Sequence, residues 1–277
     1  MVQAIRAKSI IFLHRMLTMF GVDALQGFSF ALPVLIEESV VGDVEQVVQL
    51  FNLMLSELGT SSLSISQAFL FALLDKLESL AEPIPGEMTA PHTEVERKGI
   101  RKLYISIVHH IFSTGSKITL FCDQNRHRAA DVYCKLASYT KDIPFSTETK
   151  IVLLRSAIGV FQEICKTWTD SEMPFAQQLN TAVVLNDVIP FLINAPVDGS
   201  LSVKDAQTQA VIAELGSLLW ILKEKMGDDA FVAYLAPVLQ RTAWTSSGAE
   251  ALISQLRSNL PMTTYREEFK KLVRSTV

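Results

Sequence analysis

The sequence predicts an all-α protein built as an α-solenoid, in which antiparallel helix pairs stack in a line. Three observations lead to this fold class. Helical hydrophobic periodicity runs through almost all of the 277 residues. Long helices recur at similar intervals. One central helix has an apolar face too wide for the edge of a small bundle.

The helix predicted over Thr147–Trp168 carries this wide face. An edge helix needs an apolar stripe of about 100°. Here the apolar side chains cover roughly half of the circumference at 100° per residue, so neighbours must cover the helix on two sides, as in a stacked array. Ser146 or Thr147 can cap the helix, and Pro144 fits a chain break before it. The apolar set is Ile151, Leu153, Leu154, Ala157, Ile158, Val160, Phe161, Ile164, Cys165 and Trp168, and Val152 alone lies on the polar side.

The first predicted hairpin joins helices Gln3–Phe20 and Asp23–Ser39. Gly21 can end the first helix because glycine adopts the left-handed backbone of many helix C-termini. The connection is so short that the two helices must be antiparallel. Pro33 lacks an N–H group, and we expect it to kink the second helix or to split it at Leu32.

The second predicted hairpin begins at Asp43, which we expect to cap a helix that ends at Leu58. Gly59 and the residue after it break this helix, and Leu63–Leu80 is its partner. A connector follows at Ala81–His92, with three prolines and one glycine. These residues cannot form a helix interior, so we expect a loop between repeats here, with a domain boundary as the alternative.

The third hairpin is predicted to join Thr93–Phe112 to a shorter, interrupted partner at Ser116–Phe121 and Arg126–Thr140. Thr93 and Glu96 have the spacing of a capping box.

Beyond the central helix, the pattern predicts alternating helices and turns to the last residues. Met173–Asn194 has only one charged residue, Asp187, and an expected interruption near Pro190. A turn at 198–200 follows. The remaining predicted helices are Ser202–Met226, Asp228–Arg241, Ser246–Asn259 and Thr263–Arg274.

Long helices therefore begin near residues 3, 43, 93, 147 and 202, at intervals of 40, 50, 54 and 55 residues. Helical-hairpin repeats of the HEAT type recur at roughly 40–47 residues, and longer loops extend that spacing. We expect a HEAT-repeat superhelix over residues 1–277, as a single solenoid domain of about five to six helix pairs with its Pro-rich loop at residues 81–92.

Hydrophobic residues make up 49% of the chain, so membrane spans need consideration. The closest run, Ser9–Leu35, is interrupted by His14, Arg15 and Asp23, and no run of about 18 uncharged apolar residues exists. The basic residues before Ile10–Leu13 resemble a signal peptide, but this apolar run is too short for one. We therefore expect no membrane insertion.

Charge and cysteine content limit the class of protein further. The net charge of −4 argues against a small, self-sufficient nucleic-acid-binding domain, although a local basic patch remains compatible with it. Three cysteines, Cys122, Cys134 and Cys165, cannot all pair with one another, which favours a reduced, intracellular protein.

Catalytic signatures are absent from the sequence. No nucleotide-binding glycine loop, G-x-S-x-G or H-E-x-x-H motif occurs. His109 and His110 are adjacent and point about 100° apart on a helix, so they cannot share a metal ion. Cys122, His127 and Cys134 match no common zinc spacing and lack a fourth ligand. We expect no enzyme, no metal and no cofactor.

Two basic clusters are the candidate functional residues. Arg97, Lys98, Arg101 and Lys102 form one edge in the first turns of a predicted helix, and Arg126, Arg128 and Lys135 lie on the shorter partner of the same hairpin, near His127. Such heads can neutralise phosphates, a contact that does not depend on base sequence, so the two clusters predict phosphate binding. The alternative is an ordinary solvated face balanced by Glu94, Glu96 and Asp131. Tyr104, Tyr133 and Tyr139 could stack on bases or belong to the core.

Three stretches resemble the exportin-T family of the karyopherin-β class. KSIIFLHRMLTMFGVDAL (residues 8–25) resembles a family helix with a Leu-His-Arg step and a glycine turn. ERKGIRKLYISIVHHIFSTG (96–115) resembles the family's basic helix, which ends in a Thr-Gly turn. KDAQTQAVIAELGSLLWILKEKMGDDAFVAYLAPVLQ (204–240) resembles its penultimate hairpin, including Asp205–Thr208 and the pair Tyr234 and Leu235. The similarity covers most of the chain.

The resemblance implies the C-terminal part of a nuclear export receptor. Such receptors carry tRNA from nucleus to cytoplasm with Ran-GTP, which their N-terminal repeats bind, and the C-terminal arch helps to hold the tRNA. Nuclear pore proteins are further implied partners, and shuttling between nucleus and cytoplasm is the implied localisation. The alternative function is a HEAT-repeat scaffold, or a karyopherin that binds a protein cargo in its groove.

Overall fold

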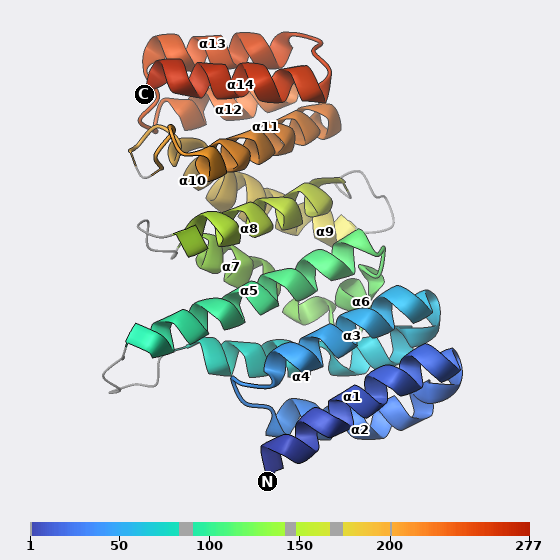
Figure 1. The fold of residues 1–277 in the computed structure, drawn as a ribbon. Helices are drawn as coiled ribbons and strands as arrows, with labels where there is room; N and C mark the ends of the chain where they lie inside the picture. The colour runs from blue at the N-terminus through green and yellow to red at the C-terminus, as the bar shows by residue number, and fades with distance from the viewer. Residues whose placement is uncertain (1, 83–90, 142–147, 167–173, 200) are drawn as a thin grey trace. The chain divides into compact units, whose positions relative to one another are not determined.

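The computed structural model describes residues 2–82, 91–141, 148–166, 174–199 and 201–277. The chain divides into two compact units, Met1–Ala129 and Ala130–Val277. The described residues form helices joined by turns, with no strand among them (Figure 1). The predicted all-α class is therefore confirmed over these ranges.

The first unit contains six α-helices and three 3-10 turns among its described residues. The first hairpin joins α1 (Val2–Phe20) to α2 (Leu25–Glu38) through η1 (Gly21–Ala24). Gly21 has a φ of 55°, as the predicted glycine stop requires. The other elements are α3 (Val44–Leu58), η2 (Gly59–Ser62), α4 (Leu63–Ala81), α5 (Pro91–Ser113), α6 (Ile118–Phe121), η3 (Arg126–Arg128) and the first residue of α7.

Within this unit each hairpin packs on the next one. Helix α1 lies against α3, α2 lies against α4, and α5 contacts both α3 and α4 (Figure 1). Contact of this kind is possible because the helices of the second hairpin bury apolar residues on two flanks. Helix α3 buries Val44, Val47, Val48, Leu50, Phe51, Met54 and Leu55.

Asp43 plays a different role from the predicted one. Its side chain makes no capping bond to α3. One carboxylate oxygen instead accepts a bond of 2.7 Å from the backbone N–H of Val40, and the other pairs with Arg6 Nε at 2.7 Å. Both groups are largely buried, so this charge-assisted bond ties α1 to the start of α3.

Pro33 does not split its helix at Leu32, so that alternative is wrong, whereas the other alternative, a kink, stays a prediction. Helix α2 runs through it from Leu25 to Glu38. Leu32, Leu35 and Ile36 on either side are buried against the unit. We infer that this packing outweighs the hydrogen bond that proline cannot make.

The second unit begins within α7 (Ala129–Lys141) and continues with α8 (Glu148–Lys166). A long irregular partner follows as α9 (Pro174–Leu179), η4 (Asn180–Val188) and α10 (Ile189–Asn194). The last elements are α11 (Ala206–Met226), α12 (Asp228–Leu239), α13 (Ser246–Arg257) and α14 (Met262–Thr276).

Helix α8 shows the predicted two-sided burial. Leu153, Leu154, Ala157, Ile158, Val160, Phe161, Ile164 and Cys165 are buried, whereas Val152 is 42% exposed. Helix α8 packs against α11 and η4, and α11 packs in turn against α14 and α12 (Figure 1). The predicted cap at Ser146 or Thr147 and the last predicted residue, Trp168, lie outside the described residues.

Two boundaries in this unit differ from the prediction. Helix α11 begins at Ala206, four residues after the predicted start, because Asp205 has an extended backbone and its carboxylate accepts 2.8 Å from the N–H of Thr208. In place of the interruption expected near Pro190, the structure has a π-helical stretch, η4, which ends at Val188. Helix α10, which contains Pro190, follows directly, so residues 174–194 are helical without a break.

The Pro-rich connector is confirmed only at its ends. Helix α4 ends at Ala81, and α5 begins at Pro91, two residues before the predicted start at Thr93. Proline at the first helical position fits this earlier start. The middle of the connector and the side chain of Thr93, which the predicted capping box requires, lie outside the description.

Candidate nucleic-acid interface

The predicted basic edge of α5 is only partly exposed. Lys102 is exposed and Lys98 half-buried, and neither has an ion-pair partner among the described residues. Arg97 is only 5% exposed. It lies three and seven residues before the buried Ile100 and Tyr104, and therefore on the helix face that packs inward. The exposed edge thus lacks Arg97, which corrects the predicted cluster of four.

Arg101 lies on the same flank as an acid two turns earlier in α5. Its guanidinium is 4.0 Å from Glu94, and its side chain is 17% exposed. An ion pair at the limit of contact between partly exposed groups stabilises little. The consequence is local neutralisation, since one of the three remaining cations of α5 faces a carboxylate.

The η3 cluster contains one restrained arginine and one open arginine. Arg128 donates 3.0 Å to one oxygen of Asp75 on α4 and contacts its other oxygen at 2.5 Å, and it covers the Phe71 ring at 4.3 Å. This bidentate pair and stacking fix the guanidinium. Arg126 is 3.5 Å from Asp123, and both side chains are largely exposed. A phosphate can compete for Arg126 more readily than for Arg128.

Lys135 belongs to the second unit, where its amine lies 5.6 Å from the centre of the Tyr139 ring. Tyr104, Tyr133 and Tyr139 are all buried, with at most 3% exposure. They are core residues and offer no free ring face for a base. The stacking alternative raised by the sequence is therefore wrong for these three tyrosines.

A second polar cluster, which sequence reasoning missed, lies in the second unit. Glu214 of α11 accepts from Gln162 of α8 at 3.1 Å and faces Arg266 of α14 at 3.3 Å and Arg155 of α8 at 3.9 Å. The adjoining hollow has a volume of about 340 Å³. Its further lining residues are Lys166, Ser217, Trp220, Ile221, Glu224, Lys225 and Met262. No sequence spacing signals this cluster because it joins three helices far apart in the chain.

Histidine and cysteine side chains are scattered. His110 is half-buried, with Nε2 2.8 Å from Ser56 Oγ, and desolvation lowers its pKa, while His109 is exposed. Cys165 is buried, which raises the pKa of its thiol, and Cys134 is exposed. In the described ranges no three His, Cys, Asp or Glu side chains gather closely enough to hold a metal ion.

The first hairpin also meets the length and composition of a membrane span. The stretch Ala4–Glu38 has a mean hydropathy of 1.6 in its most apolar window, of which 28% is buried. In the structure this stretch is a folded hairpin, turned at Gly21 and packed on α3 and α4. Its apolar character divides between this packing and an uncovered outer flank.

Comparisons with known proteins identify the family. A sequence model of the family described as Exportin-T matches residues 1–277. The chain is also similar to the curated Exportin-T of Mycosarcoma maydis, with 19% identity over 224 residues. The aligned part covers 78% of this chain and 19% of that relative, so the chain spans about a fifth of the length of the relative. Because the family match extends over the whole sequence, the chain belongs to the exportin-T family.

Proposed function

We propose that the chain is part of a nuclear export receptor that carries tRNA from nucleus to cytoplasm with Ran-GTP. Family membership is the observation that carries this proposal. In the proposal the chain supplies a stretch of the surface that holds tRNA. In this proposal Ran-GTP binds chiefly through other parts of the complete protein. Nuclear pore proteins are further proposed partners, and the complete protein shuttles between nucleus and cytoplasm.

The architecture that suits this role is one continuous HEAT-type solenoid of five to six helix pairs across residues 1–277. The stacking of hairpins within the first unit supports it. A curved wall of this kind can bind a folded RNA by its shape and phosphates, without reading a base sequence. The role is binding, and it includes no catalytic step.

Lys98 and Lys102 on α5 and Arg126 in η3 are the proposed phosphate contacts. Lys102 and Arg126 are exposed, and Lys98 is half-buried but has no ion-pair partner within the described part of the chain. Arg101 and Arg128, held by Glu94 and Asp75, are proposed as supporting residues at the edge of the same surface. Arg97 and Lys135 are proposed only as indirect contributors, since one is buried and the other lies against an aromatic ring.

The test replaces Lys98 and Lys102 with Glu in the complete protein that contains this chain. Within the described part of the chain these residues form no ion pair, so the fold should tolerate the change. Binding of folded tRNA, measured by filter binding with GTP-loaded Ran, should weaken. The slope of log K against log salt should fall by about 1 for each phosphate that is no longer neutralised.

The matched control is the double variant Arg241→Glu and Arg274→Glu, which changes the net charge equally at two exposed positions of the second unit. It should leave the salt slope unchanged. If both double variants leave affinity and slope at the wild-type values, α5 is not part of the RNA surface. Equal weakening in both would mean that only the overall charge matters.

A protein-cargo karyopherin or HEAT scaffold is the second candidate function. The net charge of −4 and the mixed-charge hollow beside Glu214 favour it, because such a surface suits a peptide with charges of both signs. Binding of tRNA by the complete protein that ignores GTP-loaded Ran would favour the scaffold. Cooperative binding of tRNA and Ran-GTP would favour the export receptor.

A further inference from the structure

The hollow of about 340 Å³ in the second unit, which we call the Glu214 hollow, combines apolar and charged side chains from α8, α11 and α14. Its apolar lining residues are Trp220, Ile221 and Met262. Its charged lining residues are Lys166, Glu214, Glu224, Lys225 and Arg266. A lining of this kind suits a ligand that has an apolar body with a charged group beside it.

Trp220 gives the hollow a fixed apolar wall. Its indole N–H donates to the carbonyl oxygen of Leu260 at 3.1 Å, so the polar edge of the ring already has its partner. The side chain is half-buried, whereas Trp244, whose N–H also has a carbonyl partner, is only 7% exposed. The Trp220 ring can therefore contact an apolar side chain without rearrangement.

Glu214 is already engaged by side chains of its own unit. Gln162 donates to its backbone carbonyl oxygen at 2.8 Å and to Oε2 at 3.1 Å. Its Oε1 faces Arg266 at 3.3 Å and Arg155 at 3.9 Å. This carboxylate therefore holds Arg266 in place at the hollow and is not itself open to a cation.

The remaining positive charge of the lining is on Lys225. Lys166 is held by Glu163 at 2.5 Å, whereas Lys225 has no ion-pair partner in the described part of the chain. The N-terminus of α14 borders the hollow at Met262, and no side chain caps it. Its first N–H groups carry the partial positive charge of a helix start. The open lysine and the uncapped helix both favour an anion beside the apolar lining.

Glu224 restricts the kind of anion. Its side chain is 47% exposed, and Lys223, at 3.9 Å, pairs with it only loosely. A nucleic-acid backbone would bring several negative charges close to this carboxylate, and repulsion would oppose its binding. A single carboxylate next to an apolar side chain avoids that repulsion, and peptides supply this combination.

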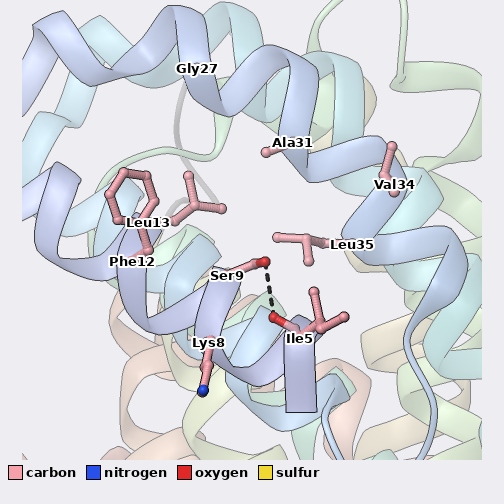
Figure 2. Close-up of a pocket in the computed structure, with 9 residues that line it drawn as sticks. All are labelled: Ile5, Lys8, Ser9, Phe12, Leu13, Gly27, Ala31, Val34 and Leu35. Carbon is pink, nitrogen blue, oxygen red and sulfur yellow. Dashed lines mark hydrogen bonds between the residues drawn. The ribbon is translucent and has the colours of Figure 1, made fainter. Parts of the chain in front are cut away.

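The apolar groove of the first unit lacks such selective groups. It lies between α1 and α2 and has a volume of about 710 Å³ (Figure 2). The hydroxyl of Ser9 is engaged within its helix, since it donates to the carbonyl oxygen of Ile5 at 3.0 Å (Figure 2). Apart from Lys8, this lining carries no charge that would select one apolar partner over another. The Glu214 hollow is smaller but chemically more specific.

We propose that the Glu214 hollow binds a short peptide segment of a partner protein, in which one large apolar residue is next to one aspartate or glutamate. The apolar side chain lies against Trp220 and Met262. The carboxylate pairs with Lys225 and the first N–H groups of α14. The hollow belongs to the second unit, so this binding does not depend on tRNA contacts by α5, and it is compatible with both candidate functions.

The experiment selects peptides from a library of random heptapeptides displayed on phage, against the complete protein that contains this chain. One class of enriched peptides should have leucine, methionine or phenylalanine next to a single aspartate or glutamate. A synthetic peptide of this class then receives a fluorescent label, and its dissociation constant is measured by fluorescence anisotropy. Replacing its acid by the amide, or its apolar residue by alanine, should each weaken binding about tenfold, and neither change alters the protein.

Two protein variants locate the peptide. Lys225→Glu should weaken binding about tenfold or more, because it places a like charge beside the peptide's carboxylate. Met262→Ser, which removes part of the apolar wall without a charge change, should weaken it about threefold or more. The matched control is Lys204→Glu, an equal charge change at an exposed lysine before the start of α11 and outside the lining. It should leave the dissociation constant within about twofold of the wild-type value.

Three outcomes would overturn the proposal. One is a selection that enriches no class with an acid beside an apolar residue. Another is an enriched peptide that binds as tightly after its acid becomes an amide, or that binds Lys225→Glu and Met262→Ser as tightly as the wild type. The third is equal weakening by Lys204→Glu and Lys225→Glu, which would attribute binding to overall charge.

Discussion

The first and last hairpins of the chain, α1–α2 and α13–α14, differ in their outer surfaces. Helix α14 buries Tyr265, Phe269 and Val273 and turns charged residues outward, where Lys270 pairs with Glu267 and Lys271 with Glu268 at 2.7 Å. Helix α1 buries an equally apolar inner flank but exposes Ile5, Phe12 and Met19.

This difference shows that two hairpins of similar length can differ in whether their outer flank is already stable in water. Water already solvates the outer flank of α14, so nothing further is required to cover it. The outer flank of α1–α2 gains free energy when another apolar surface covers it. We interpret the outer flank of α14 as a surface that is stable in water and that of α1–α2 as an exposed apolar surface.

Truncation of a phenylalanine in each hairpin should give the largest contrast. Phe269 is fully buried and packs with Tyr265 and Trp244, at ring distances of 6.2 and 6.4 Å. Phe269→Ala should lower the free energy of unfolding of the second unit by about 3–5 kcal/mol. Phe12→Ala in the 277-residue chain should change that of the first unit by no more than about 0.5 kcal/mol.

Urea titration with a separate probe for each unit measures this contrast. The three tryptophans lie at positions 168, 220 and 244, so their fluorescence follows the second unit, and hydrogen exchange in α3 and α4 follows the first. A decrease of more than about 2 kcal/mol for Phe12→Ala would show that the outer flank of α1 is already covered within the chain.

A glycine in each region gives a smaller contrast. A Cβ on Gly216 of α11 would lie 3.2 Å from Phe269 Cδ1 and 3.5 Å from Arg266 Cα, whereas Gly27 of α2 faces open space. Gly216→Leu should therefore destabilise by about 1–3 kcal/mol through overpacking. Gly27→Leu should stabilise the 277-residue chain by up to about 1 kcal/mol, because leucine favours helix.

The pH dependence of stability should be the smallest of these effects, and it should differ between the two units. All five histidines precede Ala130, so the second unit has none. Desolvation lowers the pKa of His110 from 6.5, so the folded first unit binds fewer protons than the unfolded chain. The stability that follows is fully present above pH 6.5 and is lost as the pH falls below it.

Hydrogen exchange of the α5 amides, corrected for the intrinsic rate, should therefore speed up as the pH falls from about 7.5 to about 5.5. The substitution His110→Gln should make this exchange rate less dependent on pH. Glutamine retains a partner for Ser56 but does not titrate. The urea midpoint of the second unit, followed by tryptophan fluorescence, should stay nearly constant over the same range. A pH response of α5 that persists in the variant would assign it to another group.

Periodicity predicted the helices well because it reports which residues must leave water. The ranges predicted for α3, α4, α12 and α14 agree with the structure within about two residues, the usual scatter of helix ends. The roles of single side chains were predicted less well. Asp205 moved the start of α11, and Asp43 serves Arg6 rather than its own helix.

The candidate site was less predictable than the helices. Sequence spacing placed Arg97 beside Lys98 on α5 but could not show that Arg97 is buried and Lys98 only half-buried. It placed Arg126 and Arg128 together but gave no sign of Asp75, which is 53 residues away along the chain from Arg128. The availability of a charge depends on such distant neighbours.

The sequence by itself determined that this chain is helical, that its helices come in pairs and that α8 is covered on two sides, because each follows from the spacing of apolar residues along one segment. Only the tertiary structure decided which cations remain open to a phosphate and which apolar flank of α1 lacks a cover. Those properties depend on contacts between residues far apart in sequence, and local periodicity does not record them.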